Sequence, residues 1–369
     1  MKRITLEILS INNYRNCTAI TLKPHLVLNV LTGENGAGKT SILDAIYTLT
    51  NGKSFFAHKE VYLYQEGSNY YRLEGTLAID DNRFITEISS SESTKKRIKL
   101  DDKMMKSLAE YHGRFSSFMI APKDIQILVD SSTERRRLVN KTLSQIDKTY
   151  FNHLLDYNKL LKQRNAALKN FQKTRQINRL LFEAIDEKIL QPALYITQAR
   201  KHYVEAITPL FQKFYNIISE GKEALSIQYK SSLQDQDFKE QLSQNFEKDC
   251  FAGITTHGIH RDDIEMKIND KELKKYASQG QLKSSIISLK LAQVAWIKNE
   301  TNKIPILLLD DIFDKLDAQR VERLIALCFD QLKGQIFISD TELESVNLIL
   351  KKLNIDYTHF LIKNGNIAE

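Results

Sequence analysis

Apolar and polar residues alternate along the first hundred positions in the manner of β-strands. Residues 3–9 and 26–31 are largely apolar and predict two strands; the second runs into a glycine-rich turn and then a helix at about 39–50. Three further stretches have a period of two and are separated by turns rich in Asp and Asn: residues 71–79, 83–90 and 95–100. These stretches predict an antiparallel meander, which a short buried strand at 118–121 follows.

The period then changes to that of a helix. From about 134 to 218 apolar residues recur three and four positions apart, which predicts a long helical segment. Pro192 lies within it and is expected to break or kink it, because proline lacks the backbone donor that a helix needs. A segment of this length can fold as a pair or a bundle of antiparallel helices.

Strand and helix patterns alternate again in the last third of the chain. Strands are predicted at 264–268, 304–309, 335–339 and 357–363, and helices at 280–298, 318–330 and 343–352. Such alternation is typical of an α/β sheet. We therefore expect an α/β domain made of residues 1–115 and 250–369, split by a mainly helical insertion at 116–249.

Composition narrows the class of protein without identifying it. The net charge of +7 and a pI near 9.0 permit a nucleic-acid partner, although a basic enzyme has the same balance. No apolar run approaches the ~18 residues of a membrane helix. The three cysteines, Cys17, Cys250 and Cys328, have no disulfide or zinc spacing, so we expect a cytoplasmic protein.

The turn after the second strand carries the strongest motif. It fits the P-loop pattern G-x-x-x-x-G-K-[ST], with a strand before it and a helix after it. Its backbone N–H groups and the helix N-terminus can surround the phosphates of ATP, while Lys39 reaches the β- and γ-phosphate oxygens and Thr40 binds Mg²⁺. The predicted nucleotide-binding residues here are Gly33, Glu34, Asn35, Gly36, Ala37, Gly38, Lys39, Thr40 and Ser41.

An apolar strand at 304–309 ends in two carboxylates. After a P-loop, this arrangement predicts that Asp310 holds the Mg²⁺ shell and that Asp311 polarises the attacking water. Asp311 and Lys39 are therefore the expected catalytic residues. Two acids after a strand are otherwise an ordinary surface turn, and only the P-loop favours the catalytic interpretation.

A second phosphate-binding motif is expected at the start of the helix at 280–298. Ser278, Gln279 and Gly280 resemble the signature motif of ATP-binding-cassette proteins, and residues 314–317 resemble their D-loop. The same residues also make an ordinary helix N-cap, and the sequence leaves both interpretations open. In the cassette arrangement the signature faces the γ-phosphate of a partner subunit, which implies an ATP-dependent homodimer.

Beyond these motifs the chain resembles the RecF family of bacterial recombination and replication-repair ATPases. The resemblance spans nearly the whole chain and includes residues 12–16, 52–55, 134–137, 143–147, 157–159, 161–165 and 260–263. It implies a cassette-type ATPase head (lobe I) split by a helical insertion (lobe II), with ATP and Mg²⁺ as cofactors. It also implies that the protein binds duplex, single-stranded and gapped DNA and acts in the SOS response. It further implies that the protein, together with RecR and RecO, helps RecA to load onto DNA.

Two parts of the cassette pattern are altered. The histidine that usually follows the strand at 335–338 is missing, and Ser339, Asp340 and Thr341 stand there. Gln126 is the residue we expect to act as the nucleotide-sensing glutamine. Arg15 either approaches the nucleotide or lies on the surface near a strand end.

A basic stretch in the helical insertion is the predicted DNA-binding surface. Residues 157–182 contain seven Lys or Arg and no acid, although a solvated charged helix has the same pattern. The residues expected to bind DNA are Lys159, Lys162, Arg164, Lys169 and Lys173. Lys95, Lys96, Arg97 and Lys99 form a weaker second possibility, and His257 and His260 lack a third ligand for a metal.

Two classes of function remain open from the sequence. The first is a DNA clamp that ATP closes and that slow, DNA-stimulated hydrolysis releases. The alternative is a cassette ATPase subunit of a transport or defence system. Ser278 follows Lys39 by 239 positions, and the basic helical segment lies between them. This separation is longer than is usual in a transporter subunit and favours the clamp.

Overall fold

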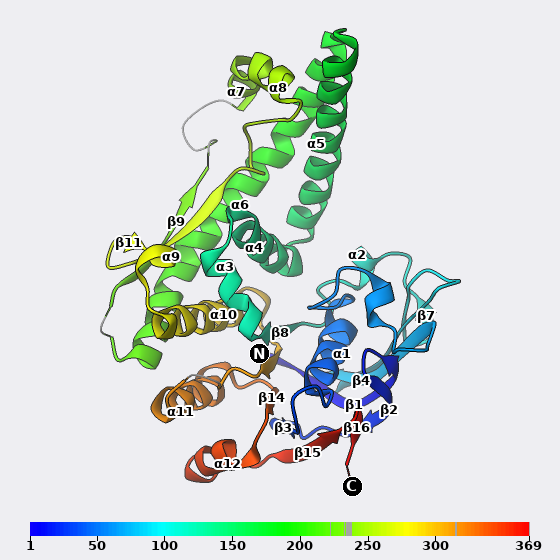
Figure 1. Cartoon of the computed structure of the whole chain (residues 1–369), viewed down its shortest axis with the longest axis vertical. Coiled ribbons are helices and arrows are strands. Elements are labelled where there is room, and N and C mark those ends of the chain that lie inside the picture. Colours follow the sequence, from blue (N-terminus) through cyan, green and yellow to red (C-terminus); the bar gives the residue numbers. More distant parts are fainter. Residues whose placement is uncertain (222, 232, 234–237, 314–315, 369) are drawn as a thin grey trace. The chain divides into compact units, whose positions relative to one another are not determined.

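The protein consists of two compact units. A computed structural model describes residues 1–221, 223–231, 233, 238–313 and 316–368 (Figure 1). Unit 1 comprises Met1–Asp124, Ile217–Glu220 and Ile287–Glu369, and unit 2 comprises Ile125–Asn216 and Gly221–Ile286. Residues 314 and 315 of the expected D-loop lie outside the described residues.

Unit 1 contains two sheets. One is mostly antiparallel, has the order β12-β1-β4-β5-β6-β7, and carries β2 beside β1. Its strands are β1 (Lys2–Tyr14), β2 (Cys17–Leu22), β4 (Tyr70–Ile79), β5 (Asn82–Ser91), β6 (Arg97–Leu100), β7 (Lys103–Met104) and β12 (Lys303–Ile304). The predicted meander is confirmed as β4, β5 and β6, whereas β2 was not predicted.

The second sheet of unit 1 is parallel except at its β16 edge. Its order is β16-β15-β3-β14-β13-β8. The strands are β3 (Leu28–Thr32), β8 (Ser117–Ile120), β13 (Ile306–Asp310), β14 (Ile336–Asp340), β15 (Thr358–Lys363) and β16 (Asn366–Ile367). Because β3, β14 and β13 are parallel neighbours, their carboxyl ends meet at one edge, where ligands of open α/β sheets bind.

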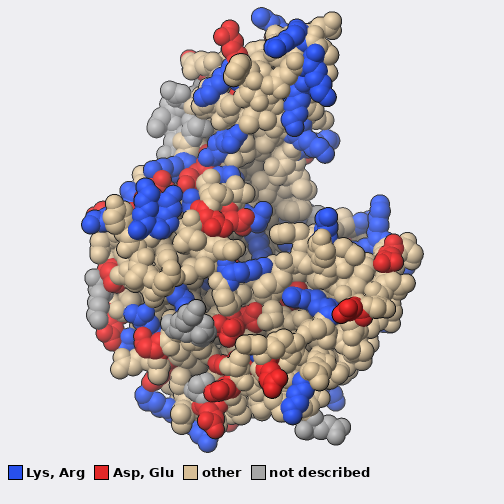
Figure 2. All heavy atoms as spheres, viewed as in Figure 1, with Lys and Arg blue, Asp and Glu red and all other residues tan. Residues whose placement is uncertain are grey.

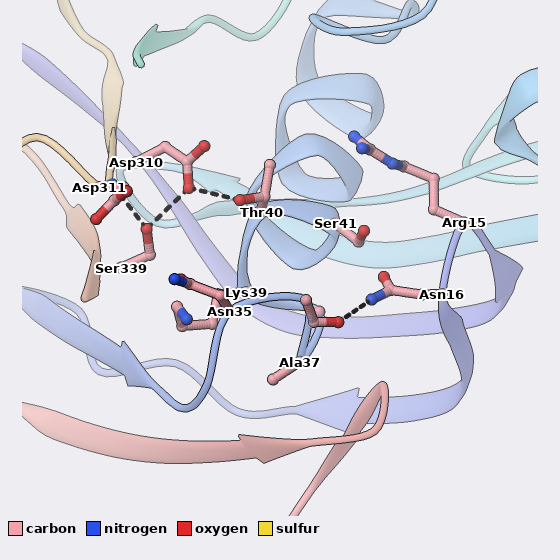
Figure 3. A pocket seen from close by; sticks show the side chains of 12 residues that line it. Arg15, Asn16, Asn35, Ala37, Lys39, Thr40, Ser41, Asp310, Asp311 and Ser339 are labelled. Atoms are coloured by element: carbon pink, nitrogen blue, oxygen red, sulfur yellow. Dashed lines mark hydrogen bonds between the residues drawn. The ribbon is translucent and has the colours of Figure 1, made fainter. Parts of the chain in front are cut away.

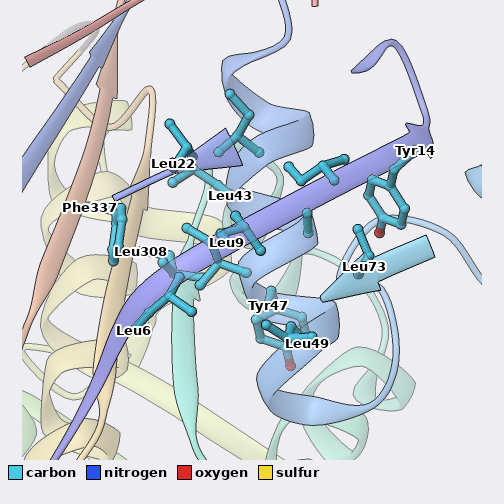
Figure 4. Close-up of a cluster of buried hydrophobic side chains, with 14 of the residues drawn as sticks. Leu6, Leu9, Tyr14, Leu22, Leu43, Tyr47, Leu49, Leu73, Leu308 and Phe337 are labelled. Atoms are coloured by element: carbon cyan, nitrogen blue, oxygen red, sulfur yellow. The ribbon is translucent and has the colours of Figure 1, made fainter. Parts of the chain in front are cut away.

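Helix α1 (Lys39–Asn51) contacts strands of both sheets and is buried along almost its whole length. Its apolar side chains share one core with β1, β4, β13 and β14, where Leu43, Leu308 and Phe337 lie together (Figure 4). Burial of this kind fixes the start of α1, and with it the P-loop, against the sheet edge. The smaller elements of unit 1 are η1 (Glu60–Leu63), α2 (Leu108–Tyr111), η2 (Pro122–Ile125), α11 (Ala318–Leu327), η3 (Cys328–Leu332) and α12 (Leu343–Lys352).

Unit 2 is built on two long antiparallel helices, α5 (Lys148–Thr174) and α6 (Arg179–Ser219). Their pairing is fixed by Asp147, which accepts hydrogen bonds from Tyr150 N at the start of α5 and from the Tyr195 hydroxyl of α6. A break or a kink was expected at Pro192, and the break is wrong because α6 runs through this residue. The chain turns instead after Arg175, which adopts a left-handed conformation with φ 56° and caps α5.

A small sheet and several short helices complete unit 2. The sheet has the order β11-β10-β9, with β9 (Leu225–Lys230), β10 (Asp263–Ile268) and β11 (Lys271–Glu272). The helices are α3 (Gln126–Val129), α4 (Ser132–Ile146), α7 (Phe238–Gln244), α8 (Phe246–Ala252), α9 (Leu273–Tyr276) and the start of α10 (Gln279–Thr301). The boundaries between the units therefore differ from the expected ones at 115 and 250. Strand β8 pairs with β13 in unit 1, and β10 pairs with β9 in unit 2.

Candidate functional site

The P-loop forms a pocket of about 280 Å³ at the carboxyl ends of β3, β13 and β14 (Figure 3). Two glycines are required by its shape. Gly38 has φ 116°, and a Cβ at Gly33, with φ 147°, would collide with the carbonyl of Ile362. The pocket is lined by Arg15, Asn16, Asn35, Gly36, Ala37, Gly38, Lys39, Thr40, Ser41, Asp310, Asp311 and Ser339. Gly33 and Glu34 line an adjoining cavity in the same unit.

Lys39 points into the loop and occupies it. Its ammonium donates to the carbonyls of Gly33 at 2.5 Å and Glu34 at 2.9 Å. Burial lowers the pKa of Lys39, and the carboxylates of Asp311, Asp310 and then Asp340 oppose that shift. The ammonium is therefore held by two neutral carbonyl oxygens, which negatively charged phosphate oxygens of a nucleotide can replace.

Asp310 connects the acidic strand with the P-loop. Its Oδ1 atom accepts hydrogen bonds from the Thr40 hydroxyl at 2.9 Å and from the Ser339 hydroxyl at 2.8 Å (Figure 3). The residue is 4% exposed, and burial raises the pKa of its carboxyl, whereas the two hydroxyls lower it. A hydroxyl and a buried carboxylate are the oxygen ligands that Mg²⁺ prefers, so these residues fit the ion.

Ser339 takes part in the site, although no role was predicted for it. Parallel pairing of β13 and β14 places it directly beside Asp310. Its hydroxyl also accepts a hydrogen bond from the backbone N of Asp311 at 3.0 Å. Asp311 has φ 47°, a left-handed conformation that is uncommon outside glycine, and the Ser339 bond holds it there. The only available signal was its position, where cassette proteins carry the switch histidine.

Arg15 and Asn16 reach the pocket from the turn between β1 and β2. The Asn16 amide donates to the carbonyl of Gly36 at 2.8 Å. Arg15 lies 3.2 Å from the buried carboxylate of Asp44 on α1 and stacks over the ring of Phe56. The interpretation of Arg15 as a pocket residue is thus the better one, and Asn16 is a pocket residue that was not predicted.

The expected signature residues lie in unit 2. The Ser278 hydroxyl accepts from Gln281 N at 3.3 Å, and the Gln281 side chain accepts from Ser278 N at 2.7 Å. This reciprocal pair is a capping box that starts α10. Gln126 is exposed at the first residue of α3. Among the described residues, those that line the P-loop pocket all belong to unit 1, so neither Ser278 nor Gln126 is one of them.

The basic stretch lies on α5 and faces solvent, with one exception. Lysine and arginine side chains gather over this helix (Figure 2), and Lys159, Lys162, Lys169 and Lys173 are all exposed. Arg164 is fully buried and binds Asp186 at 2.7 Å and Asp249 at 2.5 Å. Its assignment to DNA binding is therefore wrong, because a guanidinium held by two carboxylates is not available to phosphates.

The block at 260–263 makes buried contacts within unit 2. Asp262 binds Arg200 at 2.8 Å, and Asp263 binds Arg135 at 2.8 Å. His260 accepts or donates a hydrogen bond with the Tyr157 hydroxyl, and its pKa is lowered to about 4, chiefly by burial. The salt bridges join elements far apart in sequence rather than neighbours in the loop. The part of the chain that the structure describes contains no group of three metal-ligating side chains.

Together, a P-loop, an acidic strand and a cassette-like motif order define a P-loop ATPase head with a helical insertion. The RecF/RecN/SMC N terminal domain family matches residues 5–358. The DNA replication and repair protein RecF of Cytophaga hutchinsonii is 34% identical over 99% of this chain and 96% of its own. That of Bacteroides thetaiotaomicron is 36% identical over 99% and 98%.

Solved structures agree with these relatives. A recombination mediator protein RecF with ATPrS in the RecFOR pathway matches with a TM-score of 0.88 and 29% identity, over 99% of this chain and 98% of that one. The Smc head domain of Pyrococcus furiosus, at 15% identity and a TM-score of 0.57, shares the fold. The chain belongs to the RecF family of SMC-like ATPases. None of its described helices combines the length and apolar character needed to cross a membrane.

Proposed function

We propose that this chain is an ATP-switched DNA-binding protein of replication and recombinational repair. The observation that carries the proposal is the hydrogen-bonded group Thr40, Asp310 and Ser339 beside Lys39, in a chain of the RecF family. These residues can bind ATP with Mg²⁺ and hydrolyse it. The relatives named above are DNA replication and repair proteins, and the same task is proposed here.

The chemistry assigned to the site is phosphoryl transfer to water. Lys39 and the P-loop amides hold the phosphates, while Thr40 and Asp310 would hold Mg²⁺, which neutralises phosphate charge when bound. Asp311 orients and polarises the attacking water from its strained position beside Ser339. Catalysis then depends on positioning, and a slow rate is expected from one subunit alone.

Dimerisation is proposed to complete the site. Ser278, Gln279 and Gly280 lie at an exposed helix start whose N–H groups can bind a γ-phosphate. Because they are not among the residues that line the P-loop pocket of their own chain, we propose that they act on the nucleotide of a second copy. Gln126 is proposed as the residue that senses nucleotide. ATP would then stabilise a homodimer, since it binds the closed state better than the open one.

DNA binding is assigned to the exposed lysines of α5: Lys159, Lys162, Lys169 and Lys173. Contacts of lysine with phosphates position a protein on DNA but carry no base sequence information. The chain should therefore bind duplex and gapped DNA with little sequence preference. Two copies held by ATP would double the phosphate contacts, and DNA should in turn stimulate hydrolysis.

The biological task proposed from the family is to help RecA load at single-stranded gaps, with RecR as direct partner and RecO acting through it. This task would be carried out on bacterial DNA in the cytoplasm. The test is a RecA-filament assay on gapped DNA that is coated with single-strand binding protein, in the presence of RecO and RecR. Wild type should speed filament formation and Lys39→Ala should not; equal rates would reject the proposal.

A further inference from the structure

The most exposed large apolar side chain of the described residues is an aromatic ring on the short helix α8. Phe251, in α8, is 90% exposed. The rest of α8 is anchored, because Cys250 shares a small buried core with Leu168 of α5 and Phe182 of α6. The ring therefore presents a large apolar face to solvent from a helix that is itself fixed in place.

The position of this ring relative to α5 is fixed by several contacts. The Gln172 side chain donates to the carbonyl of Phe251 at 2.7 Å, and it also packs against Gly253, which ends α8 with φ 67°. Two residues before the ring, Asp249 binds the buried Arg164. Phe251 is therefore held beside α5 by a buried ion pair, a small apolar core and a helix-capping glycine.

On α8 and the last turns of α5, exposed lysines outnumber exposed acids. Lys169 lies one helical turn before Gln172 and Lys173 directly after it, and both are exposed. Lys248 of α8 is exposed as well, whereas Glu247 is a single exposed acid in that helix turn. On α5, residues 157–174 contain no acid at all. An uncharged apolar partner would desolvate these ammonium groups, so the surface fits a ligand with phosphates and a flat apolar face.

We propose that Phe251 is a base-stacking residue that packs against the last base pair of a duplex where the duplex ends at a gap. Lys169, Lys173 and Lys248 hold the phosphates on either side of that pair. The interior of a duplex offers no free base face, because its bases are stacked on one another, whereas a gap edge does. Aromatic and apolar side chains of DNA-binding proteins stack on or wedge between bases in this way.

This inference rests on the proposed DNA-binding function and adds the residue that contacts the gap edge. The test compares two DNAs of equal length at saturating ATP: a duplex closed by hairpins at both ends, and the same duplex with a central gap. A 2-aminopurine at the gap edge reports stacking by its fluorescence. Wild type should bind the gapped DNA more tightly and change the fluorescence of the probe.

Phe251→Ala should lose about tenfold in affinity for gapped DNA and none for the closed duplex, since one base stacking contact is removed. Phe251→Tyr should keep both the affinity and the fluorescence change, while Phe251→Leu should lose them. The matched control is Leu155→Ala, which removes an exposed apolar side chain of α5 instead of α8. This variant should behave as wild type.

An unchanged gap preference in Phe251→Ala would overturn the inference and assign the ring to a protein contact instead. Equal losses on both DNAs would also overturn it, because they would show a general defect of the basic surface. If wild type bound neither DNA, the proposed DNA-binding function itself would fail, and that outcome is distinct from a failure of Phe251 alone. Thermal unfolding of each variant should match wild type, since the ring makes few contacts.

Discussion

The Ser339 hydroxyl lies 2.8 Å from Asp310 Oδ1 and donates a hydrogen bond to it across neighbouring parallel strands. The same oxygen of Ser339 accepts from Asp311 N at 3.0 Å. One hydroxyl therefore orients the carboxylate of Asp310 and holds the backbone of Asp311. It does so from the end of β14, where cassette proteins usually carry a histidine.

Replacing Ser339 should impair hydrolysis more than nucleotide binding. Ser339→Ala removes the hydrogen bond to the Asp310 carboxylate and the one from the backbone N of Asp311. A lost bond to a charged group is worth about 1.5–3 kcal/mol, so kcat should fall about tenfold or more. ATP affinity, measured by calorimetry, should change little, because Lys39 and the P-loop are untouched. Ser339→Thr keeps the hydroxyl and should retain most activity. A normal kcat in Ser339→Ala would assign the orienting role elsewhere.

The acid limb of the ATPase pH profile should move in the same variant. Burial raises the pKa of Asp310, and the Ser339 hydrogen bond is the largest influence that lowers it. The active form is the carboxylate, so activity is present above this pKa and is lost as the pH falls through it. Ser339→Ala should therefore shift the acid limb to higher pH, and kcat measured from pH 4 to 8 checks this. An unmoved limb would mean that Asp310 does not control it.

Lys39→Ala should abolish tight ATP binding. The lysine is the cation that the P-loop brings to the phosphates, and its ammonium donates to the Gly33 and Glu34 carbonyls. We expect a loss of at least about 100-fold, in line with a desolvated charge-assisted contact. The control is Lys53→Ala, because Lys53 follows the end of α1 and does not line the pocket. Wild-type ATP affinity in Lys39→Ala would show that Lys39 does not contact the phosphates.

Dimerisation should need ATP but not its hydrolysis. Asp311→Asn should slow water activation and leave Asp310 and Thr40 in place, so dimers should persist in ATP and be seen by light scattering. Ser278→Arg should block the γ-phosphate of the second copy and leave monomers that still bind ATP. An Asp311→Asn protein that stays monomeric in saturating ATP would count against the composite site.

Neutralising Lys162, Lys169 and Lys173 should weaken duplex binding without changing ATP affinity. If all three contact phosphates, the slope of log affinity against log salt should shrink by about 2.7, at about 0.9 per contact. Arg164→Ala is the informative contrast, because it removes the ion-pair partner of the buried Asp249 and of the partly buried Asp186. It should lower the free energy of unfolding by about 3–5 kcal/mol, whereas the triple lysine variant should unfold as wild type. An unchanged salt slope would show that these lysines do not contact DNA phosphates.

The local chemistry of this protein was determined by its sequence. The P-loop is a contiguous motif. Four apolar residues followed directly by Asp310 and Asp311 likewise predict an acidic strand end from local spacing alone. The helical period likewise predicted the insertion, and a period of two predicted the meander. Each of these patterns reflects interactions between residues a few positions apart, which is why a linear reading finds them.

Only the tertiary structure decided which side chains meet across long separations. Arg164 shares a helix face with the buried Tyr157 and Leu168, so its spacing already pointed inward, but its carboxylate partners Asp186 and Asp249 are distant in sequence. Ser339 reaches Asp310 because β13 and β14 pair in one register, and Asn16 reaches Gly36 because β1 and β2 turn there. Strand pairing and buried charge depend on the whole fold, and short-range periodicity does not contain them.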